Sequence, residues 1–146
     1  MEAVILIGIQ GSGKSTFCER RFASTHLRIS MDLAGTRARE KRLLEECIAR
    51  KKDFVVDNTN SLSARRKVYI DAARAAGFKV VGYFFITDIK EALRRNAERT
   101  GKAKVPVPGI YRTMKYLQPP TYAEGFDELW EVRCENGEFV LQKVER

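Results

Sequence analysis

Residues 3–15 read Ala3-Val-Ile-Leu-Ile7 followed by Gly8-Ile-Gln-Gly-Ser-Gly-Lys-Ser15. The first five are apolar and rich in β-branched side chains, which is typical of a strand buried on both faces of a parallel sheet. The next eight match the phosphate-loop pattern G-x-x-x-x-G-K-[ST] at every fixed position. That pattern needs a helix after the loop, and residues 14–23 are predicted to form one. The stretch therefore predicts an α/β nucleotide-binding fold.

The chemistry of phosphate binding explains the residue types of this loop. Glycines let the backbone turn tightly enough to aim its N–H groups at the β- and γ-phosphates. Lys14 supplies a mobile positive charge, and the Ser15 hydroxyl is a ligand for Mg²⁺. Thr16 either contacts the α-phosphate or serves the helix. The residues predicted here to bind ATP are Gly8, Gln10, Gly11, Ser12, Gly13, Lys14, Ser15 and Thr16.

Strand and helix signals alternate along the rest of the chain. Further strands are predicted at residues 27–31, 54–56, 79–86, 128–133 and 138–144, and further helices at 37–52, 61–76, 88–100 and 111–117. Asn136-Gly137 indicates a hairpin between the last two strands. Such alternation favours right-handed crossovers and a three-layer α/β fold, with ligands at the carboxyl ends of the strands. We expect one domain over residues 1–146, with a lid at about 95–117 whose segment 101–108 is a mobile loop.

The composition favours a polyanionic partner. The net charge is +8, and residues 121–146 hold seven acids against three bases, so residues 1–120 carry +12. The three cysteines show no metal or disulfide spacing and are expected to be reduced thiols. No apolar run is long enough to span a bilayer, and we expect a cytoplasmic protein without a membrane anchor.

Residues after the second and third strands are candidates for the acceptor side. Asp32 is expected near the acceptor hydroxyl as a general base, and a helix-capping role is an equal alternative. Asp57 occupies the usual place of an acidic residue that supports Mg²⁺ through water, and the run Asn58-Thr59-Asn60 offers polar groups beside it. A simple polar turn is the other interpretation of these four residues.

Basic residues recur in two further segments. Arg95 and Arg99 are four apart, so they share a helix face leading into the lid and could close over a phosphoryl group. Arg65 and Arg66 could contact a polyanion. In both segments an ordinary solvated surface is the alternative.

These segments together resemble the kinase domain of the polynucleotide 5′-hydroxyl kinases, over nearly the whole chain. The similarity rests on residues 8–17, on Ile29-Ser-Met-Asp32, on Val56-Asp-Asn-Thr-Asn60, on Arg95-Asn-Ala-Glu-Arg99 and on Pro120-Thr-Tyr-Ala-Glu-Gly-Phe126. It implies a P-loop kinase fold with a five-stranded parallel core. It also implies transfer of the γ-phosphate of ATP, with Mg²⁺, to the 5′-hydroxyl of a nucleic acid.

The resemblance assigns roles residue by residue. Asp32 would be the general base, Lys14 and Arg99 would stabilise the transferring phosphate, and Arg95 would help hold ATP. Asp57 would act at the Mg²⁺ water shell or at the acceptor mouth. Phage members carry an arginine that binds the 3′-phosphate of the acceptor where this chain has Gly35. The residue that binds the acceptor in this chain therefore stays unassigned. No D-x-D-x-T/V nucleophile motif is present, so kinase activity alone is expected of this chain.

Two alternatives stay open at this point. The same chemistry could serve a small-molecule hydroxyl of a sugar, nucleoside or nucleotide-sugar. The chain could also be a non-catalytic ATP-binding regulatory module, although the presence of Lys14, Asp32 and Arg99 argues against that.

Overall fold

A six-stranded sheet forms the centre of the molecule. The computed structural model describes residues 1–146, apart from the side chain of Lys102. The strands are β1 (Glu2–Ile7), β2 (Leu27–Ile29), β3 (Phe54–Asp57), β4 (Lys79–Phe85), β5 (Glu128–Glu135) and β6 (Glu138–Lys143). Their order is β2-β3-β1-β4-β5-β6; the first five are parallel and β6 is antiparallel to β5. The predicted five-stranded parallel core and the terminal hairpin are confirmed.

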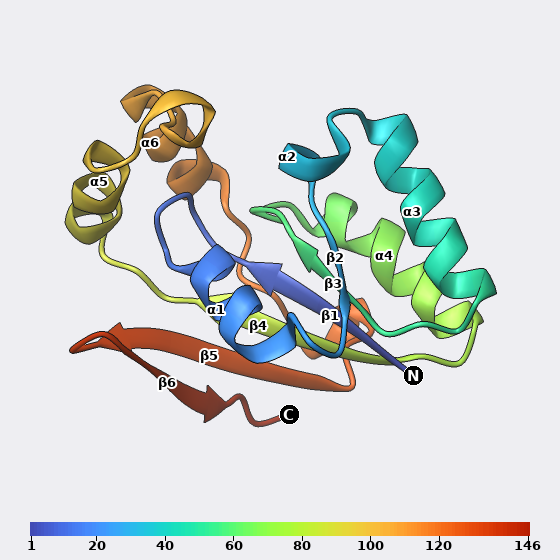
Figure 1. Ribbon diagram of the computed structural model, residues 1–146. Helices are drawn as coiled ribbons and strands as arrows, with labels where there is room; N and C mark the ends of the chain where they lie inside the picture. Colours follow the sequence, from blue (N-terminus) through green and yellow to red (C-terminus); the bar gives the residue numbers. More distant parts are fainter.

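Helices cover both faces of this sheet, as the predicted three-layer arrangement requires (Figure 1). They are α1 (Lys14–Phe22), α2 (Met31–Ala34), α3 (Arg37–Ala49), α4 (Ser63–Ala75), α5 (Ile89–Ala97) and α6 (Val107–Tyr116), with 3₁₀ turns η1 (Gly101–Ala103) and η2 (Tyr122–Glu124). One apolar cluster joins the sheet to α3 and α4, and a second joins it to α1. Every side chain of β1 from Ala3 to Ile7 is fully buried, because helices pack on both sides of it.

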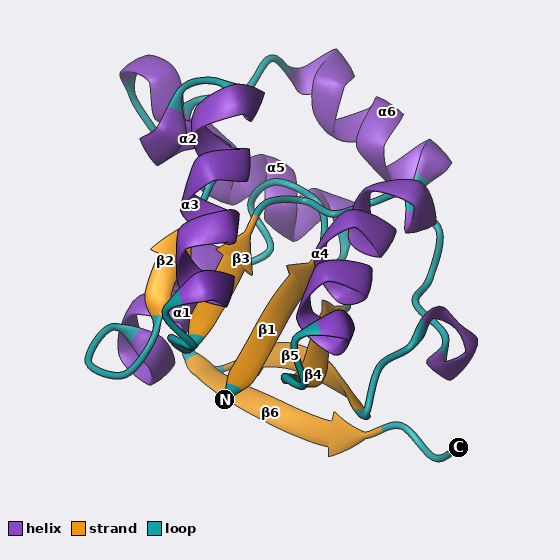
Figure 2. Cartoon of the chain, turned by 90° about the vertical axis from the view of Figure 1, so that its right-hand side faces the viewer, coloured by secondary structure: helices purple, strands orange, loops and turns teal.

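Helices α5 and α6 lie over the carboxyl ends of the strands (Figure 2). A small cluster of Ile9, Ala92 and Ile110 packs them against the phosphate loop. The buried Asn96 side chain fixes the segment between them, donating to the Val105 carbonyl (2.7 Å) and accepting from its N–H (2.8 Å). The lid position expected at residues 95–117 therefore corresponds to the end of α5, η1 and α6.

Several local boundaries differ from the predicted ones. Helix α6 starts at Val107 rather than at residue 111, because Pro108 stands in its first turn, where a missing N–H costs nothing. Strand β2 ends at Ile29, because Ser30 caps α2. Helix α5 ends at Ala97, three residues early. The hairpin turn forms as predicted, with Asn136 and Gly137 both at positive φ.

The described part of the chain has no helix of the length and apolar character needed to cross a membrane. All three cysteines, Cys18, Cys47 and Cys134, are free thiols.

Candidate functional site

The phosphate loop connects β1 to α1 in a conformation that requires glycine. Gly13 (φ 96°) stands immediately before Lys14, the first residue of α1, and Gly11 has φ 77°. A Cβ on Gly11 would lie 2.5 Å from the carbonyl oxygen of Ala92 in α5, and a Cβ on Gly8 would lie 2.9 Å from the Cβ of Phe85. The loop is therefore shaped both by left-handed backbone and by close approach of neighbouring elements.

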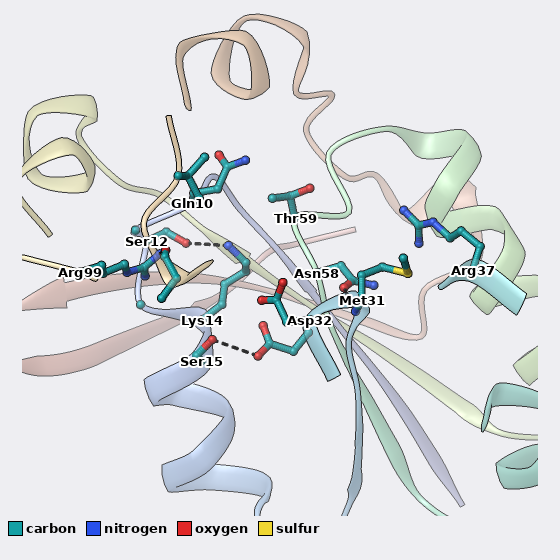
Figure 3. Close-up of a pocket in the computed structure, with 15 residues that line it drawn as sticks. Gln10, Ser12, Lys14, Ser15, Met31, Asp32, Arg37, Asn58, Thr59 and Arg99 are labelled. Atoms are coloured by element: carbon teal, nitrogen blue, oxygen red, sulfur yellow. Dashed lines mark hydrogen bonds between the residues drawn. The ribbon is translucent and has the colours of Figure 1, made fainter. Parts of the chain in front are cut away.

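A cavity of about 470 Å³ opens at this loop, at the carboxyl ends of the strands (Figure 3). It is lined by loop residues from Gln10 to Ser15, by residues that follow β2 and β3, and by Arg99. Asp32, Asp57, Asn58 and Thr59 of the predicted site all face it. Residues from four separate segments of the sequence are thus brought together, as ligand sites in parallel sheets require.

Lys14 is buried at the floor of this cavity. Its Nζ donates to the carbonyl oxygens of Gly8 (2.9 Å) and Ile9 (2.8 Å) and to the Ser12 hydroxyl (3.3 Å). The pKa of Lys14 is lowered to about 8, mainly by burial; the Asp57 charge acts in the opposite direction, the Arg99 charge lowers the pKa as well, and the Asp32 charge raises it. The amine therefore lies within electrostatic reach of both predicted acidic residues.

Ser15 and Asp57 form the candidate metal position. The Ser15 hydroxyl donates to Asp57 Oδ2 (3.2 Å). The described residues hold no cluster of three His, Cys, Asp or Glu side chains that could hold a metal by itself. A hydroxyl and one carboxylate are nevertheless the oxygen ligands that Mg²⁺ uses when a nucleotide supplies the remaining ones. The donor set fits Mg²⁺ bound together with nucleotide phosphates.

Asp32 belongs to the first turn of α2 and is not its cap. The N-cap is Ser30, whose hydroxyl accepts from the N–H of Leu33 (3.2 Å). The helix-capping alternative for Asp32 is therefore wrong. Its carboxylate is exposed at the cavity beside Lys14, with Arg99 on the far side of the lysine in the view of Figure 3.

The two predicted lid arginines share one recess beside the phosphate loop, and only Arg99 also lines the main cavity. Arg99 lines the main cavity and donates to the carbonyl of Ala103 (3.5 Å). Arg95 donates to the carbonyl of Gly11 (3.2 Å) and lines a neighbouring recess, together with Thr16 and Phe139. Arg99 thus extends to both recesses, while Arg95 and Thr16 belong only to the second.

A polar network that the sequence did not indicate supports the residues predicted to face the acceptor. The buried Glu40 accepts from the Tyr69 hydroxyl (2.7 Å), from Asn58 Nδ2 (2.8 Å) and from Arg37 (2.9 Å). Burial by itself would raise the pKa of Glu40, but these hydrogen bonds outweigh it and hold the pKa below its usual value. Asn58 Oδ1 in turn accepts from the N–H of Met31 (2.9 Å), the residue before Asp32. The network therefore fixes the backbone from which Asp32 projects.

The arginines at residues 65 and 66 have different roles from those expected. Arg66 is fully buried, donates to both oxygens of Glu124 (2.7 and 3.0 Å) and to the carbonyl of Asn60 (2.9 Å), and cannot contact an acceptor. Asn60 is also buried and donates to the carbonyl of Leu6 (2.7 Å). The predicted acceptor contacts at Arg66 and Asn60 are wrong, because both side chains tie strands and loops together. Arg65 lies beside Tyr69 and Glu40 in a recess that shares Arg37 with the main cavity.

Arg28 is a further site residue that the sequence did not indicate. Its guanidinium lies against Asp57, with Nε at 2.9 Å and Nη2 at 2.8 Å from Oδ2. The alternation of Leu27, Arg28 and Ile29 placed its side chain on one face of β2, but only the pairing of β2 with β3 shows that Asp57 shares that face.

A phosphate loop at the carboxyl edge of a five-stranded parallel core, beneath helices α5 and α6, defines a P-loop domain with the kinase fold. The chain belongs to the AAA domain family, whose model matches residues 30–120 and so includes Asp32, Asp57, Arg95 and Arg99.

The chain is also similar to individual proteins in sequence or in fold. The bifunctional polynucleotide phosphatase/kinase of Schizosaccharomyces pombe (strain 972 / ATCC 24843) is 27% identical over 135 residues, which are 90% of this chain and 33% of that protein. The chain thus spans about a third of this curated relative. Among solved structures, a gluconokinase from Sinorhizobium meliloti 1021 matches 90% of this chain and 82% of its own, with TM-score 0.62 and 18% identity. Chaetomium thermophilum Kti12, solved with ADP-AlF3, matches 90% and 88%, with TM-score 0.62 and 19% identity.

Proposed function

We propose that this domain transfers the γ-phosphate of ATP, bound with Mg²⁺, to the 5′-hydroxyl end of a nucleic acid. One observation carries the proposal: Asp32 projects its carboxylate into the same cavity as Lys14, Ser15 and Arg99, and no ion pair or hydrogen bond ties that carboxylate to any other described side chain. A phosphate-binding loop alone would serve any nucleotide-binding protein. A carboxylate at its mouth is what a kinase adds, because an acceptor hydroxyl must lose a proton as it attacks.

The roles of the side chains follow from their positions. The loop N–H groups and Lys14 hold the β- and γ-phosphates, for which Lys14 leaves the carbonyls of Gly8 and Ile9. Mg²⁺, when bound, neutralises charge on the phosphate oxygens. Ser15 and Asp57 would hold it. Asp32 accepts the proton of the acceptor hydroxyl, and Arg99 stabilises the negative charge that spreads over the transferring group.

The charge of the chain and its relative favour a polynucleotide as the acceptor. The cavity side beyond Asp32 presents Arg37 (54% exposed) and then Arg65 (39% exposed), which share the single carboxylate of Glu40. Excess positive charge therefore faces the direction from which an acceptor strand would enter. The relative from Schizosaccharomyces pombe is named a bifunctional polynucleotide phosphatase/kinase, and this chain matches a third of its length.

A substrate panel tests the proposal. The protein is incubated with γ-labelled ATP and Mg²⁺ and with RNA and DNA oligonucleotides of one sequence that end in a 5′-hydroxyl or in a 5′-phosphate. Gluconate, nucleosides and other small alcohols are the parallel acceptors. We expect label only on the 5′-hydroxyl oligonucleotides. Label confined to a small alcohol would replace the polynucleotide by that acceptor class, and no transfer to any acceptor would favour a regulatory nucleotide-binding module.

The variant Asp32→Asn separates chemistry from binding. It removes the proton acceptor but keeps the size and the hydrogen-bonding capacity of the side chain. We expect transfer to fall by about 10²- to 10⁴-fold with unchanged ATP affinity. A transfer rate equal to that of the unaltered protein would contradict the assignment of Asp32 as the base.

A further inference from the structure

Arg28 and Ser15 converge on one oxygen of Asp57. Arg28 Nε (2.9 Å) and the Ser15 hydroxyl (3.2 Å) donate to Oδ2, and Arg28 Nη2 lies 2.8 Å from the same oxygen. Arg28 Nη2 also lies 3.4 Å from the Ser15 oxygen. The Asp57 side chain is 3% exposed, and that of Arg28 is 37% exposed. A partly exposed cation therefore covers the two oxygens that make up the candidate metal position.

The sheet holds Arg28 in this place. Strand β2 pairs with β3 in parallel, with Arg28 opposite Val55, so Asp57 follows two residues later on the same face. Ile29 points to the opposite face, into the cluster formed with α3 and α4. The backbone of Arg28 is thus fixed by strand pairing, while its long side chain is free to turn toward solvent.

We propose that Arg28 competes with the divalent cation for Ser15 and Asp57. Arg28 would thereby determine how much Mg²⁺ increases the affinity for nucleotide. A guanidinium on Asp57 Oδ2 and a hydrated Mg²⁺ compete for these oxygens, because Arg28 and the Ser15 hydroxyl already occupy Oδ2 and Arg28 also lies against the Ser15 oxygen. Two positive charges a few Å apart also repel each other. Binding of the metal therefore turns Arg28 away from Asp57, and loss of the metal lets it return.

The competition has a thermodynamic consequence for nucleotide binding. Without metal, Arg28 leaves one more positive charge beside the phosphates and so favours the metal-free nucleotide. With metal, part of the binding free energy is spent on displacing Arg28. Both effects reduce the gain in nucleotide affinity that Mg²⁺ provides. The inference deepens the proposed function, since it concerns the metal of ATP, but it makes no use of the acceptor.

Calorimetry on the whole chain tests it. The dissociation constant of the β,γ-imido analogue of ATP is measured in EDTA and in Mg²⁺. The value in EDTA divided by the value in Mg²⁺ is called the metal gain. Arg28→Met keeps the length of the side chain and removes the guanidinium. We expect this variant to raise the metal gain about tenfold, which is the effect of one charge-assisted pair.

Arg37→Met is the matched control, because Arg37 lines the same cavity and removing it changes the net charge equally without touching Asp57. Its metal gain should stay within about threefold of the unaltered protein. Equal effects of the two variants would mean a general field of charge and would overturn the proposal. An unchanged or smaller metal gain in Arg28→Met would overturn it as well.

A measurement on the unaltered protein does not depend on the variant folding. The Nε–H resonance of Arg28, assigned through its backbone connection, reports on its hydrogen bond to Asp57. Adding Mg²⁺ to the complex with the analogue should shift it to the position of a solvated arginine and speed its exchange with water. A resonance that stays unshifted would show that Arg28 remains on Asp57 and would end the proposal. A chain that binds the analogue but labels no acceptor would defeat the proposed function alone.

Discussion

Lys14 illustrates how burial tunes a residue for phosphate binding. The residue is 8% exposed, and its amine donates to two carbonyls and a hydroxyl of its own loop. These neutral partners replace water but do not balance the charge, so the desolvated amine has a pKa of about 8. Phosphate groups would restore the missing negative charge.

The affinity for ADP should therefore fall as the pH rises through about 8. Bound phosphates raise the pKa of Lys14, so binding takes up a proton above that pH and none below it. Calorimetry from pH 7 to 9.5 should show a loss approaching tenfold per pH unit above 8, while the ADP phosphates, with a pKa near 6, stay ionised. In Lys14→Met the slope should disappear. The same slope in that variant would assign the proton to another group.

Arg99→Ala should lower kcat by about 10²-fold or more with little change in the affinity for ATP. Its guanidinium lines the cavity and makes one long hydrogen bond, to Ala103, so it is free to follow charge that develops during transfer. Arg94→Ala is the matched control, because Arg94 pairs with Glu91 and Glu98 on the exposed side of α5. Steady-state kinetics distinguish the two. An effect of Arg99→Ala on ATP affinity alone would make Arg99 a ground-state contact.

At the level of single residues, the sequence identified the site residues that depend on neighbouring sequence. It missed those whose role depends on contacts between distant parts of the chain. The loop from Gly8 to Ser15 could be predicted because consecutive residues make it. Asp32 and Asp57 could be placed because both follow strands whose carboxyl ends share an edge. The burial of Arg66 against Glu124 could not be seen, since 58 residues separate the two partners. Arg28 was missed for the same reason, as its partner lies on a neighbouring strand.

The terminal hairpin β5–β6 supports the phosphate loop from below. The ring of Phe139 in β6 packs edge-on against Phe17 of α1, with centroids 5.2 Å apart. Its Cε1 atom would lie 3.2 Å from a Cβ on Gly13. The hairpin itself could be predicted from Asn136-Gly137, but its position under the loop depends on the sheet order, which no local signal contains.

Phe139→Ala should destabilise the protein by about 2 kcal/mol and also weaken ADP binding. The substitution leaves a void between β6 and α1, and Gly13 then loses its neighbour. Val140→Ala is the control on the adjacent position, where the side chain is 47% exposed and a change within about 0.5 kcal/mol is expected. Urea unfolding and calorimetry measure both effects. Unchanged ADP affinity in Phe139→Ala would show that the hairpin serves stability alone.

At the scale of the whole molecule, positive charge is concentrated in residues 1–120. They carry +12, and the negative charge of residues 121–146 lowers the total to +8. These residues build the cavity, whereas the acidic remainder forms η2 and the hairpin. The charge imbalance could be counted from the sequence. The side of the cavity on which positive charge is in excess could be found only from the structure, because only the fold shows that Arg37 and Arg65 share one carboxylate there.

The KM for a 5′-hydroxyl oligonucleotide should therefore rise steeply with salt, while the KM for ATP should change little. Each phosphate contact to a single strand contributes a slope of about −0.7 in log affinity against log salt concentration. Steady-state assays between about 50 and 200 mM salt give the slope directly. A 5′-hydroxyl nucleoside, which has no internucleotide phosphate, is the control acceptor. Equal slopes for both acceptors would argue against a strand bound along the basic side.

Helix α5 contacts the phosphate loop through backbone atoms. Gly11 lies directly against Ala92, and Arg95 holds the carbonyl of Gly11. A change in the loop on nucleotide binding is therefore expected to reach α5, which leads directly to Arg99. Coupling of this kind is reciprocal, so an acceptor that favours the nucleotide-bound arrangement of α5 would also raise the affinity for the donor. The enzyme proposed here would then commit a nucleotide to reaction mainly when its second substrate is already in place.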